Sequence, residues 1–203
     1  MSRARCVPRG MTLVELLVTM AVLAILTGLV VVMLVRAKTS WQASTTRAAV
    51  RQELQEISWR ISREVQASSL TFLTDGGASG LQAFSFVSAV GPEGRFLTDD
   101  QGSPAWNQQL VYYLVPGTTR LLRKEIPRDF TANPEQLRAL TPAELAAACD
   151  GQGRLVSSAV NRLRLTPQTD SQTAVLEVQA QGTSAHGGQE RLGRRQTILL
   201  YNE

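Results

Sequence analysis

The sequence predicts an α+β protein, in which one long N-terminal helix precedes a domain built mainly of antiparallel strands. Three observations support this fold class. Residues 11–35 are apolar except for Thr12, Glu15, Thr19, Thr27 and Gly28, with Glu15 as their single charge. No proline interrupts residues 11–68. After Ser68, short apolar segments alternate with glycine- and proline-containing turn signals, which are typical of strands.

Residues 11–35 are expected to form a transmembrane helix. Twenty-five residues at about 1.5 Å rise each cover the roughly 30 Å hydrocarbon core of a bilayer. Glu15 is the exception within this segment, because a charged side chain near the bilayer centre costs about 2.5–3.5 kcal/mol on insertion scales. Ionisable residues in membrane segments are usually functional. The sequence therefore makes Glu15 a candidate functional residue.

Residues 36–68 are expected to continue the same helix as an amphipathic segment. Their apolar residues recur at spacings of three and four, which places them on one helix face: Val50, Leu54, Ile57, Ile61 and Val65. Charged residues and glutamines occupy the remaining surface of this segment. The pattern predicts a helix that packs its apolar face onto a globular domain.

Residues 69–203 are expected to form that domain, which is rich in β-structure. The predicted strands are 81–90, 110–115, 120–126, 155–165, 174–180 and 196–200. Phe84 and Phe86 are expected to share one strand face. The sequence Thr141-Pro142-Ala143-Glu144 fits a capping box with proline at the first helical position, so 142–149 should be a short helix. The glycine-rich segment 182–193 is expected to be a mobile loop.

The composition gives little support to nucleic-acid binding. The formal net charge is +4, but Arg3, Arg5 and Arg9 all precede the apolar segment, and no Lys/Arg cluster stands out in the remainder. The 168 residues after Val35 are enough for one domain with a real core.

No catalytic or cofactor-binding pattern is recognisable, so we expect neither an enzyme nor a bound cofactor. His186 is the single histidine and has no acidic neighbour in the sequence. Asp99-Asp100 could contribute to a calcium site, but two adjacent acids in a loop are more often solvated. Cys6 and Cys149 do not suggest a pair, and Cys149 is expected to be a small buried residue or, less often, one half of an intermolecular bridge.

The N-terminus resembles the signature of type IV prepilins and type II secretion pseudopilins. In that family a short basic leader ends in glycine and is followed by an apolar residue, threonine, leucine, an aliphatic residue and glutamate. Here residues 1–10 match the leader, and Met11-Thr12-Leu13-Val14-Glu15 match the rest. One departure is Met11, since the family usually begins its mature chain with phenylalanine. The resemblance implies cleavage between Gly10 and Met11, N-methylation of Met11, and a role for Glu15 in assembly register.

The resemblance also implies partners and a location. It implies processing by a prepilin peptidase and assembly with other major and minor pilins or pseudopilins on an inner-membrane platform. The chain would sit in membrane lipid of the inner membrane, with its N-terminus cytoplasmic and its C-terminal domain on the periplasmic or extracellular side. The order of elements, the segment 156–165 and the closing segment 198–202 resemble J-type pseudopilins and W-type minor pilins.

Other interpretations of the apolar segment remain open. A cleaved secretory signal has a 7–15-residue apolar core followed by a small-residue cut site, and this segment is longer and lacks such a site. A plain single-pass anchor is the stronger alternative, but it does not explain the register of Gly10 and Glu15. The competing functional class is a membrane-anchored binding or sensory domain that does not polymerise.

Overall fold

The computed structural model describes residues 12–91, 95–128, 130, 137–168, 172–183 and 188–200. The chain divides into two compact units, which meet between Thr45 and Thr46. The first contains the N-terminal part of helix α1 (Leu13–Gln66), and the second contains the end of that helix and all the strands that the structure describes.

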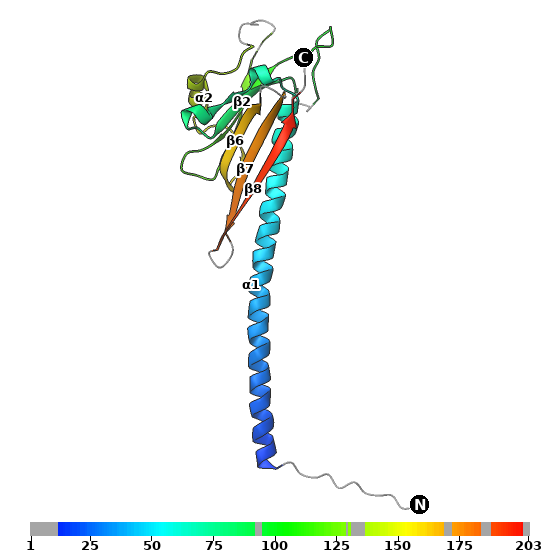
Figure 1. Ribbon diagram of the computed structural model, residues 1–203, viewed down its shortest axis with the longest axis vertical. Helices are drawn as coiled ribbons and strands as arrows, with labels where there is room; N and C mark the ends of the chain where they lie inside the picture. Colours follow the sequence, from blue (N-terminus) through cyan, green and yellow to red (C-terminus); the bar gives the residue numbers. More distant parts are fainter. Residues whose placement is uncertain are drawn as a thin grey trace, which may run out of the picture. The chain divides into compact units, whose positions relative to one another are not determined.

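The N-terminal part of α1 is one continuous helix (Figure 1). Its residues 13–35 are predominantly apolar and all exposed. Its most apolar window of 18 residues has a mean hydropathy of 2.8, and none of that window is buried within the protein. Leu13, Leu17 and Met33 are 77%, 61% and 69% exposed. By length and composition this helix can cross a membrane, which supports membrane anchoring of the chain.

In the second unit, α1 buries one face against the strands. The predicted apolar stripe is confirmed, since Val50, Leu54, Ile57, Ile61 and Val65 are all at most 4% exposed. Ser58 and Ser62 are also buried on this helix and are small enough to let it approach the strands closely. Charged side chains such as Arg51 and Glu56 occupy the exposed surface.

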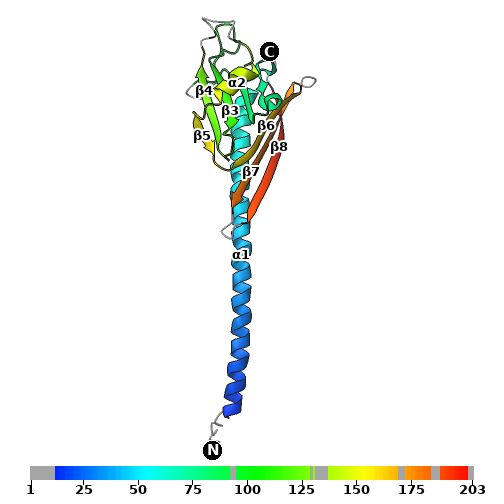
Figure 2. The same cartoon turned by 90° about the vertical axis from the view of Figure 1, so that its left-hand side faces the viewer.

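Among the described residues, five strands form an antiparallel sheet in the order β1-β2-β3-β4-β5. Figure 2 shows β3, β4 and β5 of this sheet. Their bounds are Thr74–Asp75, Ala83–Ser88, Gln108–Leu114, Leu121–Pro127 and Arg154–Ser157. Three further strands, β6 (Val160–Gln168), β7 (Thr173–Thr183) and β8 (Gln189–Leu199), form a second antiparallel sheet in that order. The short helices are η1 (Leu70–Phe72), η2 (Gly76–Ser79) and α2 (Pro142–Ala148). The predicted α+β class is therefore confirmed.

The larger sheet is covered on both faces, which explains why its central strands are apolar almost throughout. Leu110 and Tyr112 of β3 belong to the core shared with α1 and the smaller sheet, whereas the alternate residues Val111 and Tyr113 face α2. Phe84 and Phe86 share one strand face as predicted, and both rings stack with Tyr112, with ring centroids 5.4 and 6.3 Å from its own.

The short helix α2 begins as the sequence predicts. Thr141 Oγ1 accepts a hydrogen bond from the Glu144 backbone N–H, and the Thr141 backbone N–H donates to Glu144 Oε2 at 2.8 Å. Pro142 occupies the first turn, where its missing N–H costs nothing. Leu145 is fully buried and anchors α2 on the sheet.

The single strand predicted for 155–165 is wrong in one respect, because the chain breaks there into β5 and β6, which belong to different sheets. Ser157 causes a local turn: its Oγ accepts from the Ala159 N–H at 3.0 Å and donates to Glu53 Oε1 of α1 at 2.6 Å. A side chain that bonds to the backbone two residues on competes with strand pairing.

The loop predicted for 182–193 is also wrong over most of its described residues. β7 continues to Thr183 and β8 begins at Gln189, with Gly182 paired opposite Glu190 and Gly193 opposite Gln179. Contacts with α1 hold this end of the hairpin, since Glu190 forms a 2.8 Å ion pair with Arg47. Tertiary packing therefore overrides the weak strand preference of glycine.

Candidate assembly site

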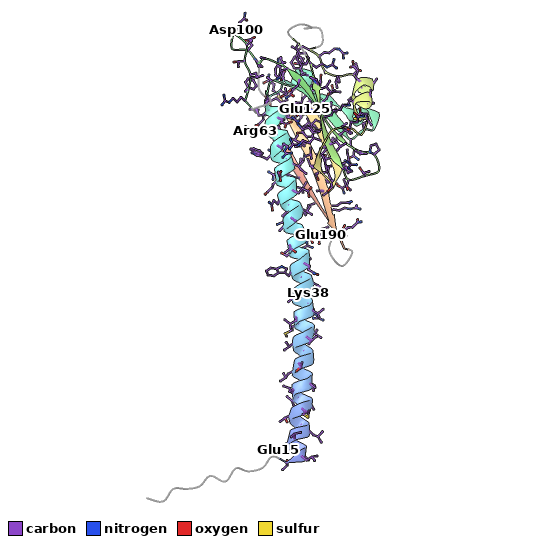
Figure 3. All side chains as sticks on the ribbon, turned by 180° about the vertical axis from the view of Figure 1, so that it is seen from behind. Glu15, Lys38, Arg63, Asp100, Glu125 and Glu190 are labelled. Atoms are coloured by element: carbon purple, nitrogen blue, oxygen red, sulfur yellow. The ribbon has the colours of Figure 1, made fainter. Side chains whose placement is uncertain are left out.

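The candidate site lies at the start of α1, where Glu15 occupies the first turn of the helix (Figure 3). The helix begins at Leu13, directly after Thr12. Four backbone N–H groups at any helix start lack partners within the helix, and they carry partial positive charge. A carboxylate at this position is therefore in favourable electrostatic surroundings.

Thr12 and Glu15 form reciprocal hydrogen bonds. The Thr12 backbone N–H donates to Glu15 Oε2 at 2.9 Å, and Thr12 Oγ1 donates to the same oxygen at 3.1 Å. Geometry also allows Thr12 Oγ1 to accept from the Glu15 backbone N–H at 3.3 Å. This is the pattern of a capping box, in which the two residues satisfy one another's backbone donors.

The two oxygens of the Glu15 carboxylate are used unequally. Oε2 takes both hydrogen bonds from Thr12, whereas Oε1 accepts none from the part of the chain that the structure describes. Intramolecular bonds at Oε2 reduce the cost of holding the carboxylate in an apolar segment. Oε1 remains available to a donor from outside the subunit.

Apolar side chains around Glu15 are exposed. Leu13, Leu16 and Leu17 are 77%, 50% and 61% exposed. Exposed apolar surface of this extent requires lipid or other helices. The start of α1 thus combines an exposed apolar surface with one carboxylate. Of its two oxygens, Oε2 is hydrogen-bonded to Thr12, and Oε1 has no hydrogen bond within the described residues.

The sequence-predicted site residues fall into two groups. Glu15 is described, whereas Gly10 and Met11 lie outside the described residues. The part played by Thr12 was not predicted from the sequence, although a threonine three residues before a glutamate at the start of an apolar segment is a recognisable capping signal. The same signal did predict the start of α2.

Two of the remaining candidates, Cys149 and Asp99, lie in the described part of the chain. Cys149 is half-buried, and burial followed by the negative charge of Asp150 raises the pKa of its thiol to about 11. Asp99 Oδ1 accepts from the backbone N–H groups of Gln101 and Ser103, which makes it a turn-forming residue. Within the described ranges, no three or more His, Cys, Asp or Glu side chains are grouped to hold a metal ion. His186 lies outside those ranges.

Comparison with known proteins identifies the N-terminal segment. The family described as the prokaryotic N-terminal methylation motif matches residues 8–31, which include the predicted cleavage point, Thr12, Glu15 and the first turns of α1. No curated protein and no solved structure matches the chain significantly. The matched motif implies processing by a prepilin peptidase and association with other pilins, and it favours a structural subunit over an enzyme. The chain carries the N-terminal motif of type IV pilin-like proteins on a helix long and apolar enough to span a membrane.

Proposed function

We propose that this protein is a minor pilin or pseudopilin, a membrane-inserted subunit that assembles into, or primes, a type IV pilus or a type II secretion pseudopilus. The observation that carries the proposal is the methylation motif at residues 8–31, with its glutamate in the first turn of a membrane-length helix. A plain anchor would need neither the motif nor the buried-charge cost of Glu15.

Processing would create the assembly-competent end of the chain. Cleavage between Gly10 and Met11 removes the leader 1–10, and N-methylation of Met11 follows. Glu15 then stands four residues after the new amino terminus. Thr12 lies between them, directly before the first helical residue, and donates two hydrogen bonds to Glu15 Oε2.

Glu15 would set the register in which neighbouring subunits pack their N-terminal helices. Oε1, which accepts no hydrogen bond within the described chain, receives the amino group of the neighbouring subunit. An unpartnered charge in an apolar environment is costly and a partnered one is tolerable. Glu15 therefore selects the docking depth at which the two groups meet, more than it adds net affinity.

The exposed apolar side chains of 11–35 would pack first against inner-membrane lipid and then against the helices of other subunits. The amino end lies on the cytoplasmic side, where the peptidase acts, and the β-rich domain of 69–203 lies on the other side of the membrane. Amphipathic residues 36–68 join the two parts. The partners are the peptidase, the inner-membrane assembly platform, and other major and minor pilins or pseudopilins.

The order of elements favours a larger minor subunit of the J-type or W-type over a major pilin. One long helix, an irregular middle with short helices, and late strands β6 to β8 are the features of that group which the chain resembles. Such a subunit would sit with other minor subunits at the tip of the filament.

The intact mass of the protein tests the proposal. The full chain is expressed in a host with its prepilin peptidase and purified from the membrane. We expect a mass that lacks residues 1–10 and carries one added methyl group. Gly10→Val should abolish the cut because the side chain is bulky, whereas Gly10→Ala should allow partial processing. Recovery of the 203-residue form alone from the unmodified gene would contradict the proposal.

A further inference from the structure

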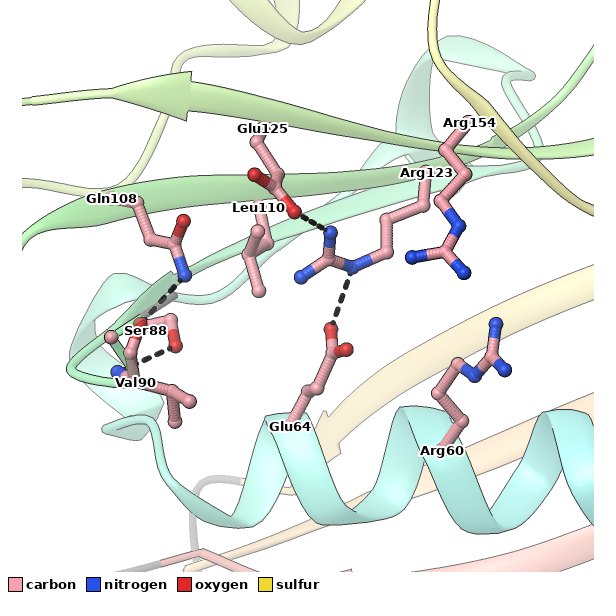
Figure 4. A pocket seen from close by; sticks show the side chains of 10 residues that line it. Arg60, Glu64, Ser88, Val90, Gln108, Leu110, Arg123, Glu125 and Arg154 are labelled. Carbon is pink, nitrogen blue, oxygen red and sulfur yellow. Dashed lines mark hydrogen bonds and ion pairs between the residues drawn. The ribbon is translucent and has the colours of Figure 1, made fainter. Parts of the chain in front are cut away.

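A cavity of about 400 Å³ opens between the last turns of α1 and strands β2 to β5. Its lining includes three arginines and two glutamates: Arg60, Arg123, Arg154, Glu64 and Glu125 (Figure 4). Arg60 comes from α1, and Arg123 and Arg154 come from β4 and β5. Figure 4 shows the three guanidinium groups turned toward the same space.

Among the described residues, two of the three arginines have acidic partners, and Arg154 does not. Arg60 pairs with Glu56 on the same helix at 3.4 Å. Arg123 forms ion pairs with both glutamates of the lining. Its Nε lies 3.0 Å from Glu64 Oε2, and its guanidinium group also pairs with Glu125. Arg154 makes no ion pair or hydrogen bond within the described part of the chain, although it stands directly opposite Arg123 on the neighbouring strand. Like charges directly opposite one another destabilise a sheet. Arg154 is therefore the arginine of this lining that no acid in the described part of the chain pairs with, and a partner carboxylate would neutralise it.

An apolar surface adjoins the charged pocket. Trp59 and Phe96 are 63% and 46% exposed, and together with Arg60, Arg63 and Ala67 they line a neighbouring hollow. Arg63 lies over the Trp59 ring, with its guanidinium carbon 5.4 Å from the ring centroid. Exposed tryptophan, phenylalanine and arginine side by side are the residues enriched at protein–protein interfaces.

We propose that this surface, formed by Arg60, Arg123 and Arg154 with the adjoining Trp59 and Phe96, docks a partner subunit through an aspartate or glutamate that lies beside a large apolar side chain. The carboxylate enters the pocket and bonds to Arg154 and Arg60, and the apolar side chain covers Trp59 and Phe96. The inference rests on the proposed function, because it assigns the surface by which the soluble domain would select a neighbouring subunit.

The mixed composition of the surface favours a protein over other anions. A nucleic acid or an anionic lipid surface needs several unopposed cations. Here Glu64 and Glu125 pair with Arg123 and Glu56 pairs with Arg60, which leaves Arg154 as the one unpaired arginine of the lining among the described residues. Planar guanidinium groups bind a carboxylate in a bidentate manner, which fixes the position of a single side chain. The flanking aromatic rings require an apolar contact in the same partner.

Photocrosslinking in the native host membrane tests the inference with the full chain. The probe is p-benzoylphenylalanine in place of Phe96, which leaves the arginines intact. We expect crosslinks to one segment of another subunit that contains an acidic residue next to an apolar one. Arg154→Glu should lower the yield at least about tenfold, because it reverses the charge that the carboxylate meets. Arg154→Gln should give an intermediate yield. Replacing the partner's acid by arginine should restore crosslinking to the Arg154→Glu chain.

Arg162→Glu is the matched control, since Arg162 is exposed on β6 of the other sheet, outside the pocket lining. Its yield should stay within about twofold of the unmodified chain. Crosslinks confined to lipid, to a second copy of this chain or to a segment without an acid would overturn the inference, as would a yield that Arg154→Glu leaves unchanged. The amino-terminal mass of the same sample separates the two proposals: a processed chain with no such crosslink contradicts the docking surface alone, and an unprocessed chain contradicts the pilin function.

Discussion

Glu64 on α1 and Arg123 on β4 form an ion pair that joins the helix to the sheet, with 3.0 Å between Oε2 and Nε. Their side chains are only 21% and 13% exposed. The same Glu64 oxygen accepts a 2.9 Å hydrogen bond from the Tyr112 hydroxyl. Burial, and then the charge of Glu64, raises the pKa of Tyr112. Burial opposes the charge of Arg123, but Glu64 and Glu125 outweigh it and raise the pKa of that guanidinium.

Removing Glu64 should therefore destabilise the second unit. Glu64→Ala leaves Arg123 with Glu125 alone and Tyr112 without its acceptor, and we expect a loss of about 2–3 kcal/mol in the free energy of unfolding. Glu64→Gln keeps an acceptor for Tyr112 and should lose less. Urea unfolding of the detergent-solubilised chain, followed by tryptophan fluorescence, measures both.

The control for this prediction is Glu56→Ala. Glu56 is also on α1 and pairs with Arg60 at 3.4 Å, but its side chain is 66% exposed. Exposed helix pairs contribute about 0.3–0.5 kcal/mol, so this variant should unfold close to the unmodified chain. Equal losses in the free energy of unfolding for Glu56→Ala and Glu64→Ala would contradict the prediction. The contacts of Glu64 with Arg123 and Tyr112 would then stabilise the fold no more than an exposed ion pair does.

Gly182 lets β7 approach α1. A Cβ atom at this position would lie 2.6 Å from Val50 Cγ2 and 3.1 Å from Thr46 Cγ2. Valine is stiff at χ1 in a helix and cannot turn its methyl away. We expect Gly182→Ala to cost about 1–3 kcal/mol through overpacking, despite the ordinary preference of strands for alanine over glycine. Thermal unfolding by circular dichroism measures the loss.

Two further variants separate a local clash from a general effect of glycine replacement. Val50→Ala in the Gly182→Ala background removes the clashing methyl groups, so the double variant should lose less than the sum of the two single losses. Gly193→Ala should be neutral or stabilising, because its Cβ would meet nothing nearer than Gln179 Cγ at 3.4 Å. A purely additive double variant would rule out the proposed contact between Gly182 and Val50.

The acid sensitivity of α2 should depend on Glu144. Its carboxylate bonds to Arg138 and to the Thr141 backbone and side chain, which lowers its pKa from 4.5 to about 2. A carboxyl group whose pKa is lower in the folded state contributes stability that is complete above the unfolded value of 4.5 and is lost as the pH falls toward 2. Melting temperatures from pH 5 to pH 2 should therefore fall more steeply for the unmodified chain than for Glu144→Gln. Parallel slopes would contradict this assignment.

The sequence predicted the elements whose signals are local. The apolar stripe from Val50 to Val65, the capping box of α2 and the shared face of Phe84 and Phe86 each depend on residues within a few turns or one strand. Glu15 was identifiable for the same reason, since its motif lies in one short segment and its charge is conspicuous among apolar neighbours.

Features that depend on distant contacts were not predictable in this way. The segment 182–193 contains enough glycine to suggest a loop, but Val50 and Arg47 of α1 stabilise the hairpin there. Likewise, the pocket unites residues from α1, β4 and β5, and no spacing in the sequence brings Arg60, Arg123 and Arg154 together. Only the strand register places the last two opposite one another.

Substitutions of Glu15 distinguish assembly from simple anchoring. A plain anchor gains from losing a membrane carboxylate, so Glu15→Leu should insert at least as well as the unmodified chain in either case. In a pilin, the same variant should be cleaved and inserted but fail to recruit partner subunits. Co-purification with other minor subunits from the host membrane, together with a filament or secretion assay, measures recruitment.

Two further Glu15 variants test whether position matters as well as charge. Glu15→Asp is shorter by one methylene and keeps the carboxylate near Thr12, so recruitment should be intermediate. The double variant Glu15→Leu with Leu16→Glu exchanges these two adjacent residues. It keeps the composition but moves the acid by about 100° around the helix. It also removes the acid from the position where Thr12 bonds to Oε2, so recruitment should fail as completely as in Glu15→Leu. If the exchanged chain recruits partners normally, a carboxylate anywhere near the helix start is sufficient and Glu15 does not set the register. If all three variants recruit normally, Oε1 receives no group from a neighbour, and the assembly role proposed for this residue is wrong.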